Sequence, residues 1–208
     1  MITYLIIATV CLVTISAFSK REVYFKLMFN PYQVKNSNHW YRFISHAFVH
    51  ADWSHLMFNM LTLFFFGVFV ESKFAQYFGE KATFLYISEF ILASIISSIP
   101  SFLKHKDNYS YNAVGASGAV SAILFTSILF NPLNKIYIFF IPIGIPAFIF
   151  GIFYLVYSAY MSKKNIDNIG HDAHFWGAVF GFIFPLLIPL NEPLFFKFVN
   201  IIKLNFGL

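Results

Sequence analysis

Apolar residues fill six long stretches of the chain, and shorter polar segments separate them. The stretches cover residues 2–18, 55–70, 83–103, 114–130, 136–161 and 171–190. A helix needs about 20 such residues to cross the roughly 30 Å hydrocarbon core of a bilayer. The third and sixth stretches have that length, whereas the second and fourth are short. The pattern therefore predicts an all-α membrane protein with a bundle of six transmembrane helices.

The fifth stretch is interrupted by Pro142, Gly144 and Pro146. Proline removes a main-chain donor and clashes with the preceding turn, but it suits the first turn of a helix. We therefore expect the fifth helix to begin near Pro146. The roughly 15 residues that remain would span only about 22 Å, so this helix must lie against protein or a thinned bilayer.

The longest connection, residues 19–54, mixes basic residues with Phe, Tyr and Trp. Trp and Tyr favour the membrane interface, so we expect this first loop to be partly embedded there. At the other end, residues 191–208 place Lys197 and Lys203 among apolar residues, which predicts a short amphipathic segment on the membrane surface. We expect residues 1–208 to form a single membrane domain with a core of about 40–190.

The composition agrees with lipid as the solvent. The 208 residues are 59% apolar and 11% charged, whereas soluble domains are about 45–50% apolar and about 25% charged. The net charge of +5 comes from scattered residues rather than from basic runs interleaved with aromatics, so we expect no nucleic-acid partner. The single cysteine, Cys11, excludes an intrachain disulfide and is expected to be a small apolar residue of the first helix.

Ser117 stands in the run Gly-Ala-Ser-Gly at 115–118, at the start of the fourth apolar stretch. A polar residue within a span is a candidate functional residue. However, Gly115, Ala119 and Ala122 recur at i, i+4 and i+7, and such a stripe of small residues allows two helices to approach closely. Taken alone, the serine is explained more readily by packing than by chemistry.

His174 opens a second stripe of small residues, because Gly177 and Gly181 follow it at i+3 and i+7. Two such stripes on two helices would pack together. The fourth and sixth helices enter from the same side in a six-helix chain, so Ser117 and His174 would meet at similar depth. This arrangement indicates a serine–histidine pair in which the histidine is the general base.

His55 and Asn59 lie at i and i+4 on one face of the second helix. An imidazole and an amide pointing together, with no carboxylate beside them, suit a developing oxyanion. A hydrogen-bonded packing pair explains the same pattern equally well.

The other histidines considered are His39, His46, His50 and His171. His46 and His50 are four residues apart, which makes a metal site the alternative. There is no HExxH motif and no cysteine ligand, so we expect neither a metal nor another cofactor. Asp172 lies about 200° around a helix from His174 and would point away from it, which favours a dyad without a carboxylate.

Together these residues resemble a known family, the rhomboid intramembrane serine proteases. The resemblance covers about residues 40–190, in the family's order. The matching motifs are Gly-Ala-Ser-Gly at 115–118, the run from Ala173 and His174 to Gly177 and Gly181, the run from His50 through His55 to Asn59, the pair Arg42 and His46, and the pair Gly67 and Glu71.

The resemblance implies a six-helix core with a water-accessible cavity. Ser117 would be the nucleophile and His174 the general base and then the general acid. His55, Asn59 and the backbone N–H of Ser117 would stabilise the oxyanion. The other residues implied to support the site are Gly115, Gly118, Gly177, Gly181, Arg42, His46, His50 and Glu71. Arg42 and Glu71 would brace the first loop.

The family cleaves transmembrane segments of membrane-protein substrates, and its fifth helix would act as a lateral gate. Substrate proteins and membrane lipid are therefore the expected partners. The family places the catalytic side outside the cytoplasm, whereas the Lys and Arg count of the loops favours the opposite orientation; we follow the family. We expect a multi-pass protein of a prokaryotic cell (inner) membrane with an extracytoplasmic active site.

The sequence departs from the family at Ser121, one turn after Ser117, where tyrosine is frequent, and at Trp176, where a smaller residue is common. Two other functions remain as alternatives. One is a non-catalytic membrane binding protein or chaperone of the same fold, which retention of Ser117 and His174 disfavours. The other is a proton-coupled transporter or channel, which the lack of paired carboxylates within the spans disfavours.

Overall fold

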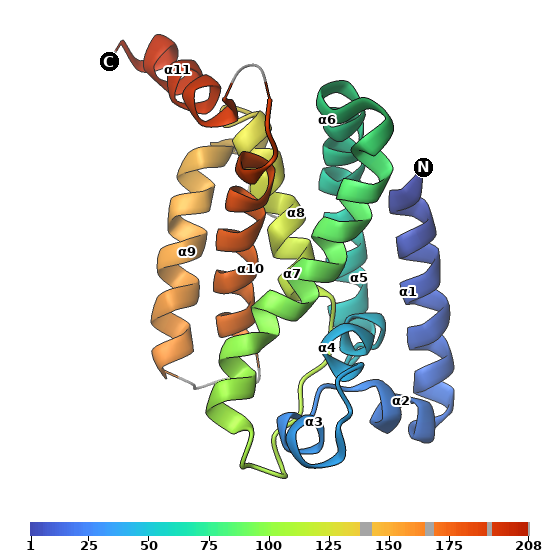
Figure 1. Cartoon of the computed structure of the whole chain (residues 1–208). Helices are drawn as coiled ribbons and strands as arrows, with labels where there is room; N and C mark the ends of the chain where they lie inside the picture. Colours follow the sequence, from blue (N-terminus) through green and yellow to red (C-terminus); the bar gives the residue numbers. More distant parts are fainter. Residues whose placement is uncertain (138–142, 165–168, 191–192, 208) are drawn as a thin grey trace.

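A computed structural model describes residues 1–137, 143–164, 169–190 and 193–207. A helix lies in each of the six apolar stretches (Figure 1). The bounds of these helices are α1 (Ile2–Ser19), α5 (Trp53–Thr62) continued by a π-helical turn (Leu63–Gly67) into α6 (Val68–Phe78), α7 (Ala82–His105), α8 (Ser117–Phe130), α9 (Ala147–Lys164) and α10 (His171–Ile183).

Within the described part of the chain, two segments are long and apolar enough to cross a membrane. They are Ile2–Ser19 and Trp53–His105, and the second contains α5, α6 and α7. The second apolar stretch is thus longer as a helix than its sequence pattern predicts. The fifth helix begins directly after Pro146, as expected, whereas Pro142 lies outside the described residues.

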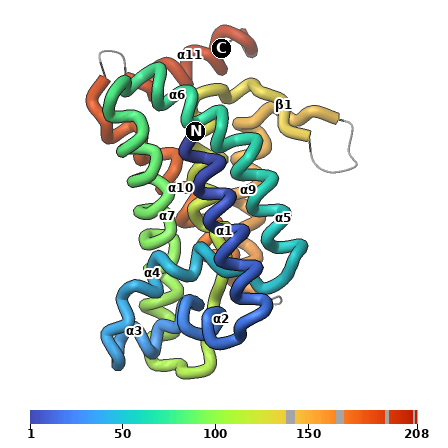
Figure 2. Tube along the Cα trace, turned by 90° about the vertical axis from the view of Figure 1, so that its right-hand side faces the viewer, coloured from blue at the N-terminus to red at the C-terminus, as the bar shows by residue number. Residues whose placement is uncertain are grey.

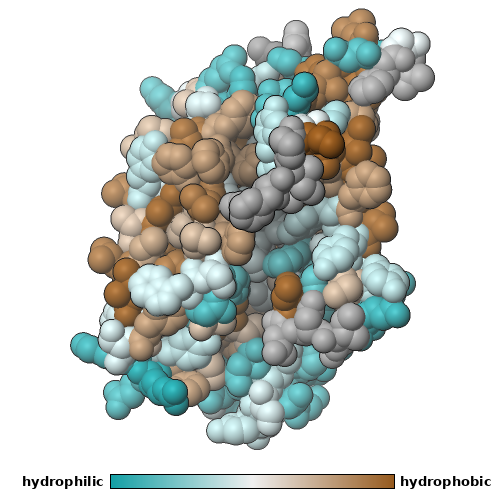
Figure 3. All heavy atoms as spheres, turned by 180° about the vertical axis from the view of Figure 1, so that it is seen from behind, coloured by the Kyte–Doolittle hydropathy of each residue, from teal (hydrophilic) through white to brown (hydrophobic). Residues whose placement is uncertain are grey.

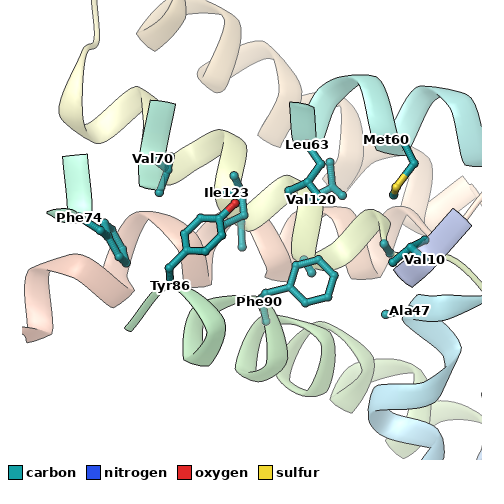
Figure 4. Packing of buried hydrophobic residues seen from close by; sticks show 14 of the residues in the cluster. Val10, Ala47, Met60, Leu63, Val70, Phe74, Tyr86, Phe90, Val120 and Ile123 are labelled. Carbon is teal, nitrogen blue, oxygen red and sulfur yellow. The ribbon is translucent and has the colours of Figure 1, made fainter. Parts of the chain in front are cut away.

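Helix α8 lies at the centre of the bundle, between α5, α7 and α10 (Figures 1 and 2). Every residue from Gly118 to Leu129 is buried. The main core forms where α8 meets its neighbours, and Figure 4 shows Ile123 and Val120 of α8 facing Tyr86 and Phe90 of α7. Because α8 is covered on all sides, small residues near its start are needed for other backbones to reach it.

The outer surface of the bundle is apolar. Large side chains such as Leu12, Phe65, Phe84 and Phe153 are exposed on its helices. Figure 3 shows apolar residues over much of the side of the molecule and polar residues toward its lower end and again near its top. An apolar belt on outward-facing helices is the surface expected of a protein whose solvent is lipid.

The first loop folds into short helices at the end of the bundle where α8 and α10 begin (Figure 1). These are α2 (Arg21–Leu27), α3 (Pro31–Ser37), α4 (Arg42–Ser45) and a 3-10 turn (His46–Phe48). Phe29 and Ala113 exchange two main-chain hydrogen bonds of 2.9 Å. The loop is thereby joined directly to the segment that precedes Ser117.

The opposite end of the bundle carries two short antiparallel strands and the last helix. Strand β1 (Lys135–Ile136) pairs with β2 (Ile145–Pro146), and α11 (Leu194–Phe206) follows α10 and the 3-10 turn Phe184–Leu187 (Figure 2). The expected helix in the tail is therefore present, and it lies far from the start of α8.

Candidate active site

Ser117 is the first residue of α8, and a sharp bend precedes it. Gly115 has φ +114, in a region that residues with a side chain rarely adopt. Gly115 therefore lies outside the helix, and the predicted stripe of Gly115, Ala119 and Ala122 is wrong in its first member. The bend leaves Ser117 at the helix N-terminus, where main-chain N–H groups have no partner within the helix.

Two histidines of the first loop hold this bend in place. The main-chain oxygen of His46 accepts a hydrogen bond of 2.9 Å from the Gly115 N–H, and Nε2 of His50 accepts one of 3.3 Å from the Ala116 N–H. The ring of His46 is within 3.0 Å of the Ser98 hydroxyl on α7. His46 and His50 thus hold the segment before Ser117 through hydrogen bonds to Gly115 and Ala116.

The proton on His50 can be assigned from its neighbours. The Thr14 hydroxyl donates to the Phe48 carbonyl at 3.0 Å and lies 3.1 Å from Nδ1 of His50. A hydroxyl has one proton, so Thr14 must accept from the Nδ1–H of His50. Nε2 is then unprotonated and free to accept from Ala116. Fully buried His50 is therefore a neutral ring with both nitrogens in use.

His55 and Asn59 lie on α5, facing the bend. The His55 ring packs so closely on Gly115 that a Cβ there would lie 2.7 Å from the ring Nε2. The rings of His55 and His50 meet edge to face at 5.0 Å. Asn59 follows one turn along the same face. Its buried amide nitrogen has no hydrogen-bond partner among the described residues, which is the arrangement expected of a donor kept for a reacting oxygen.

Helices α8 and α10 touch through their backbones. A Cβ on Gly177 would overlap the carbonyl of Gly118, whose carbon would lie only 2.8 Å away, and a Cβ on Gly181 would overlap the main chain of Ala122. The close packing expected from the stripe of Gly177 and Gly181 is thus present, and its partners on α8 are Gly118 and Ala122. We call this contact between the two helices the seam.

The seam also fixes how Ser117 and His174 are placed. A Cβ on Gly118 would lie 3.5 Å from the main-chain oxygen of Ala173. Gly118 directly follows Ser117, and Ala173 directly precedes His174, so the two candidate residues flank one backbone contact. Both helices begin at the same end of the bundle, as expected (Figure 1). Both side chains are partly exposed.

Asp172 is turned toward α9, where its carboxylate accepts a hydrogen bond from Ser162. This agrees with the expectation that it points away from His174. His171 is buried and packs edge to face on Tyr157 at 5.6 Å. Within the part of the chain that the structure describes, no three His, Cys, Asp or Glu residues are arranged to hold a metal ion.

Of the two residues expected to brace the first loop, only Arg42 bonds within it, and the expectation is wrong for Glu71. The guanidinium of Arg42 donates to the Phe25 and Met28 carbonyls within the first loop. Glu71 lies on α6 near the opposite end of the bundle (Figure 1). Its carboxylate accepts from the N–H of Ile2 and from the N–H and hydroxyl of Thr3, at 2.7 to 3.0 Å. The free N–H groups at the start of α1 thus hold the Glu71 carboxylate at the end of the bundle away from the first loop.

Sequence reasoning missed Thr14, Ser98 and Tyr154. Thr14 and Ser98 orient the rings of His50 and His46. Both are polar residues within apolar stretches, so the rule that marked Ser117 could have marked them. Tyr154 on α9 lies beside His174 with a ring separation of 6.3 Å. Nothing in the pattern distinguishes it from the 11 other tyrosines.

Comparison with known proteins adds the family. A family model described as "Rhomboid domain" matches residues 37–190. The Arabidopsis thaliana protein named "RHOMBOID-like protein 12, mitochondrial" is 31% identical over 146 residues, which cover 65% of this chain and 42% of that protein. The Arabidopsis thaliana "Rhomboid-like protein 11, chloroplastic" is 32% identical over 98 residues, covering 47% of this chain and 32% of that protein. The chain thus spans less than half the length of either relative.

Proposed function

Because the chain belongs to the rhomboid family, we propose that it is an intramembrane serine endopeptidase that cleaves transmembrane segments with Ser117 and His174. The observation that carries this proposal is the backbone contact between α8 and α10. Gly118 and Ala173 meet there, and each adjoins one member of the pair. A serine and a histidine side by side at the mouth of two helices form the minimal unit for nucleophilic catalysis.

The chemistry would proceed in two steps. In the first, the Ser117 Oγ attacks the peptide carbonyl, and His174 takes the hydroxyl proton and delivers it to the leaving amine. The acyl group then remains on Ser117. In the second, His174 removes a proton from water, which attacks the ester and releases the acid, and the proton returns to Ser117. No metal or cofactor takes part in either step.

The negative oxygen formed in each step would be held by three donors. They are the N–H of Ser117 at the start of α8, the amide nitrogen of Asn59, which has no partner in the part of the chain that the structure describes, and His55 against Gly115. The histidines of the first loop would keep this group in place by fixing Gly115 and Ala116. Preformed donors of this kind stabilise the transition state because they need no rearrangement as charge develops.

The membrane arrangement is part of the proposal. We place α1, the continuous α5–α6 rod, α7, α8, α9 and α10 across the bilayer, with the first loop and α11 at its two surfaces, in a single domain. The active site opens at the end that carries the first loop, and the family's orientation would make this the extracytoplasmic side. Both relatives are named for plant organelles, so the comparisons give no support to a prokaryotic membrane.

Transmembrane proteins are the proposed substrates. A helix in lipid keeps its carbonyls in its own hydrogen bonds, so a substrate must unwind locally before Ser117 can attack. Segments with helix-weakening residues are therefore the preferred targets.

Labelling with a fluorophosphonate tests the nucleophile without a known substrate. The purified protein should be labelled, Ser117→Ala should not be labelled, and His174→Ala should react far more slowly. Ser110→Ala is the matched control, because Ser110 lies exposed in the loop before the bend and should change nothing. Folded wild-type protein that takes no label would overturn the proposal and favour the non-catalytic alternative.

A further inference from the structure

Tyr154 joins three helices at the candidate active site. It lies on α9, and its hydroxyl is 2.6 Å from the Ser121 hydroxyl on α8. Its ring centre lies 6.3 Å from that of His174 on α10, with the planes inclined by 31°. The buried residues of α9 include the small residues Ala147, Gly151 and Ser158, which allow this helix to lie close to the bundle.

The approach of α9 brings this ring into place. Gly151 is one turn before Tyr154, and a Cβ there would lie 3.2 Å from Ile128 and 3.5 Å from Phe125 of α8. A larger residue at 151 would therefore move α9 outward. The Tyr154 ring also packs on Phe125 at 5.5 Å, so its position is fixed by packing as well as by its hydroxyl.

Ser121 lies one helical turn after Ser117 on the same face of α8. The hydrogen bond between the Tyr154 and Ser121 hydroxyls thus places the phenol ring beside the imidazole, at the level of α8 one turn after the proposed nucleophile. Aromatic rings at 4.5 to 7 Å attract one another, and a close ring restricts rotation of its neighbour. Asp172, the carboxylate nearest in sequence, is bonded to Ser162 instead.

We infer that Tyr154 is a positioning residue for His174. The Tyr154 ring packs beside the imidazole, and the hydrogen bond to Ser121 keeps the Tyr154 hydroxyl in place. Tyr154 then supplies an orienting aromatic ring from α9, in addition to the His171 ring, whose centre lies 5.9 Å from that of His174. This inference rests on the proposed function. It makes the docking of α9 onto α8 a condition for catalysis.

The test compares Tyr154→Leu with Tyr154→Phe on the purified full chain. Two rates are measured: cleavage of a fluorescent reporter with one transmembrane segment, and labelling of Ser117 by a small fluorophosphonate. Misplacing a catalytic base by about 1 Å costs on the order of 10²-fold, so the leucine variant should lose about 10- to 100-fold in kcat. Its KM should stay within a factor of about three.

The rate of probe labelling should fall by the same factor as kcat. Reaction with the small probe also needs His174, but it does not require a transmembrane segment to enter between the helices. The phenylalanine variant keeps the ring and loses one neutral hydrogen bond, so it should stay within about tenfold of wild type. Ser121→Ala should match it. Tyr160→Leu is the control, since Tyr160 lies exposed six residues further along α9.

Three results would overturn the inference. They are a leucine variant with wild-type labelling and kcat, a leucine variant altered only in KM, and a phenylalanine variant as impaired as the leucine variant. If Tyr154→Leu proves too unstable to purify, Tyr154→Phe and Ser121→Ala still test the inference, because a loss of clearly more than about tenfold in kcat with the ring retained would overturn it. A wild-type protein that neither cleaves nor takes the probe would instead contradict the proposed function itself.

Discussion

Gly177 of α10 lies directly against the carbonyl group of Gly118 of α8, and neither helix leaves room for a side chain between them. Ser117 precedes Gly118, and His174 is one turn before Gly177 on the same helix. The contact therefore fixes the register of two helices, and with it the distance between the proposed nucleophile and its base. The contact that packs α8 against α10 therefore also sets the geometry of the proposed catalytic pair.

Gly177→Ala should both destabilise the protein and slow its reaction with the probe. The added methyl group overlaps the Gly118 carbonyl, so α10 must shift, and overpacking of this kind costs about 1–3 kcal/mol. Gly170→Ala is a matched control directly before the same helix, because a Cβ there would meet only Ala173 at 3.8 Å. Thermal unfolding and probe labelling measure both effects. Equal behaviour of the two variants would contradict the role given to the seam.

The neutral state of His50 predicts how stability depends on pH. Burial, followed by the charge of His55, lowers the pKa of His50 from 6.5 to about 3. Between these values the unfolded chain binds a proton that the folded chain excludes, so stability falls as pH drops below 6.5. His46, whose pKa burial lowers to about 4, acts in the same sense.

His50→Gln keeps an acceptor for the Ala116 N–H but cannot titrate. The loss of stability between pH 6.5 and 4 should therefore become shallower, by up to about 1.4 kcal/mol per pH unit for one proton. Denaturant unfolding in detergent at several pH values measures this slope. An unchanged slope would show that His50 is not held neutral by the fold. His39→Gln is the control, because His39 is not among the histidines that hold the bend.

Asn59→Ala should affect catalysis more than stability. The amide nitrogen has no hydrogen bond to lose within the described structure, whereas removal of one oxyanion donor costs about 10²–10³ in kcat. The unfolding temperature should change little, and cleavage of a transmembrane reporter should fall by that factor. Asn36→Ala, at an exposed position of α3, is the control. A variant that is destabilised but normally active would assign Asn59 to packing instead.

Glu71→Ala should destabilise the protein without slowing the folded molecules. The carboxylate binds three donors at the start of α1, and leaving such groups unpaired costs about 1–3 kcal/mol. Thr3→Val removes one of the three donors and should cost less. Activity is measured per folded molecule, by titration of Ser117 with the probe. Slower turnover at unchanged stability would return Glu71 to the role of bracing the first loop.

Regular features of this molecule follow from its sequence. The six apolar stretches each contain a helix, because alternatives that leave backbone groups unpaired are excluded in lipid. Pro146 marks the start of α9 since proline fits a first turn. The spacing of Gly177 and Gly181 predicts a seam because small residues on one face allow backbone contact. These are local rules, and each acts over a few residues.

The remaining features depend on contacts between distant residues. The bend at Gly115 precedes the start of α8, and the ring of His55, 60 positions away, leaves no room for a side chain there. Glu71 is hydrogen-bonded to Thr3, which is 68 positions away in the sequence. Tyr154 is hydrogen-bonded to Ser121, which is 33 positions away. No periodic pattern of apolar or small residues in the sequence predicts such pairs. In a chain with 30 Phe and 12 Tyr, the aromatic residue that reaches the site is identified only by the fold.

The central claim is that Ser117 and His174 cleave transmembrane segments. The most direct measurement is cleavage in proteoliposomes of a reporter whose one transmembrane segment carries glycine and other helix-weakening residues. We predict cleavage by the wild-type protein and none by Ser117→Ala or His174→Ala, with all three proteins folded alike. Cleavage that persists in Ser117→Ala, or a wild-type protein that is folded but inert toward both reporter and fluorophosphonate, would contradict the account.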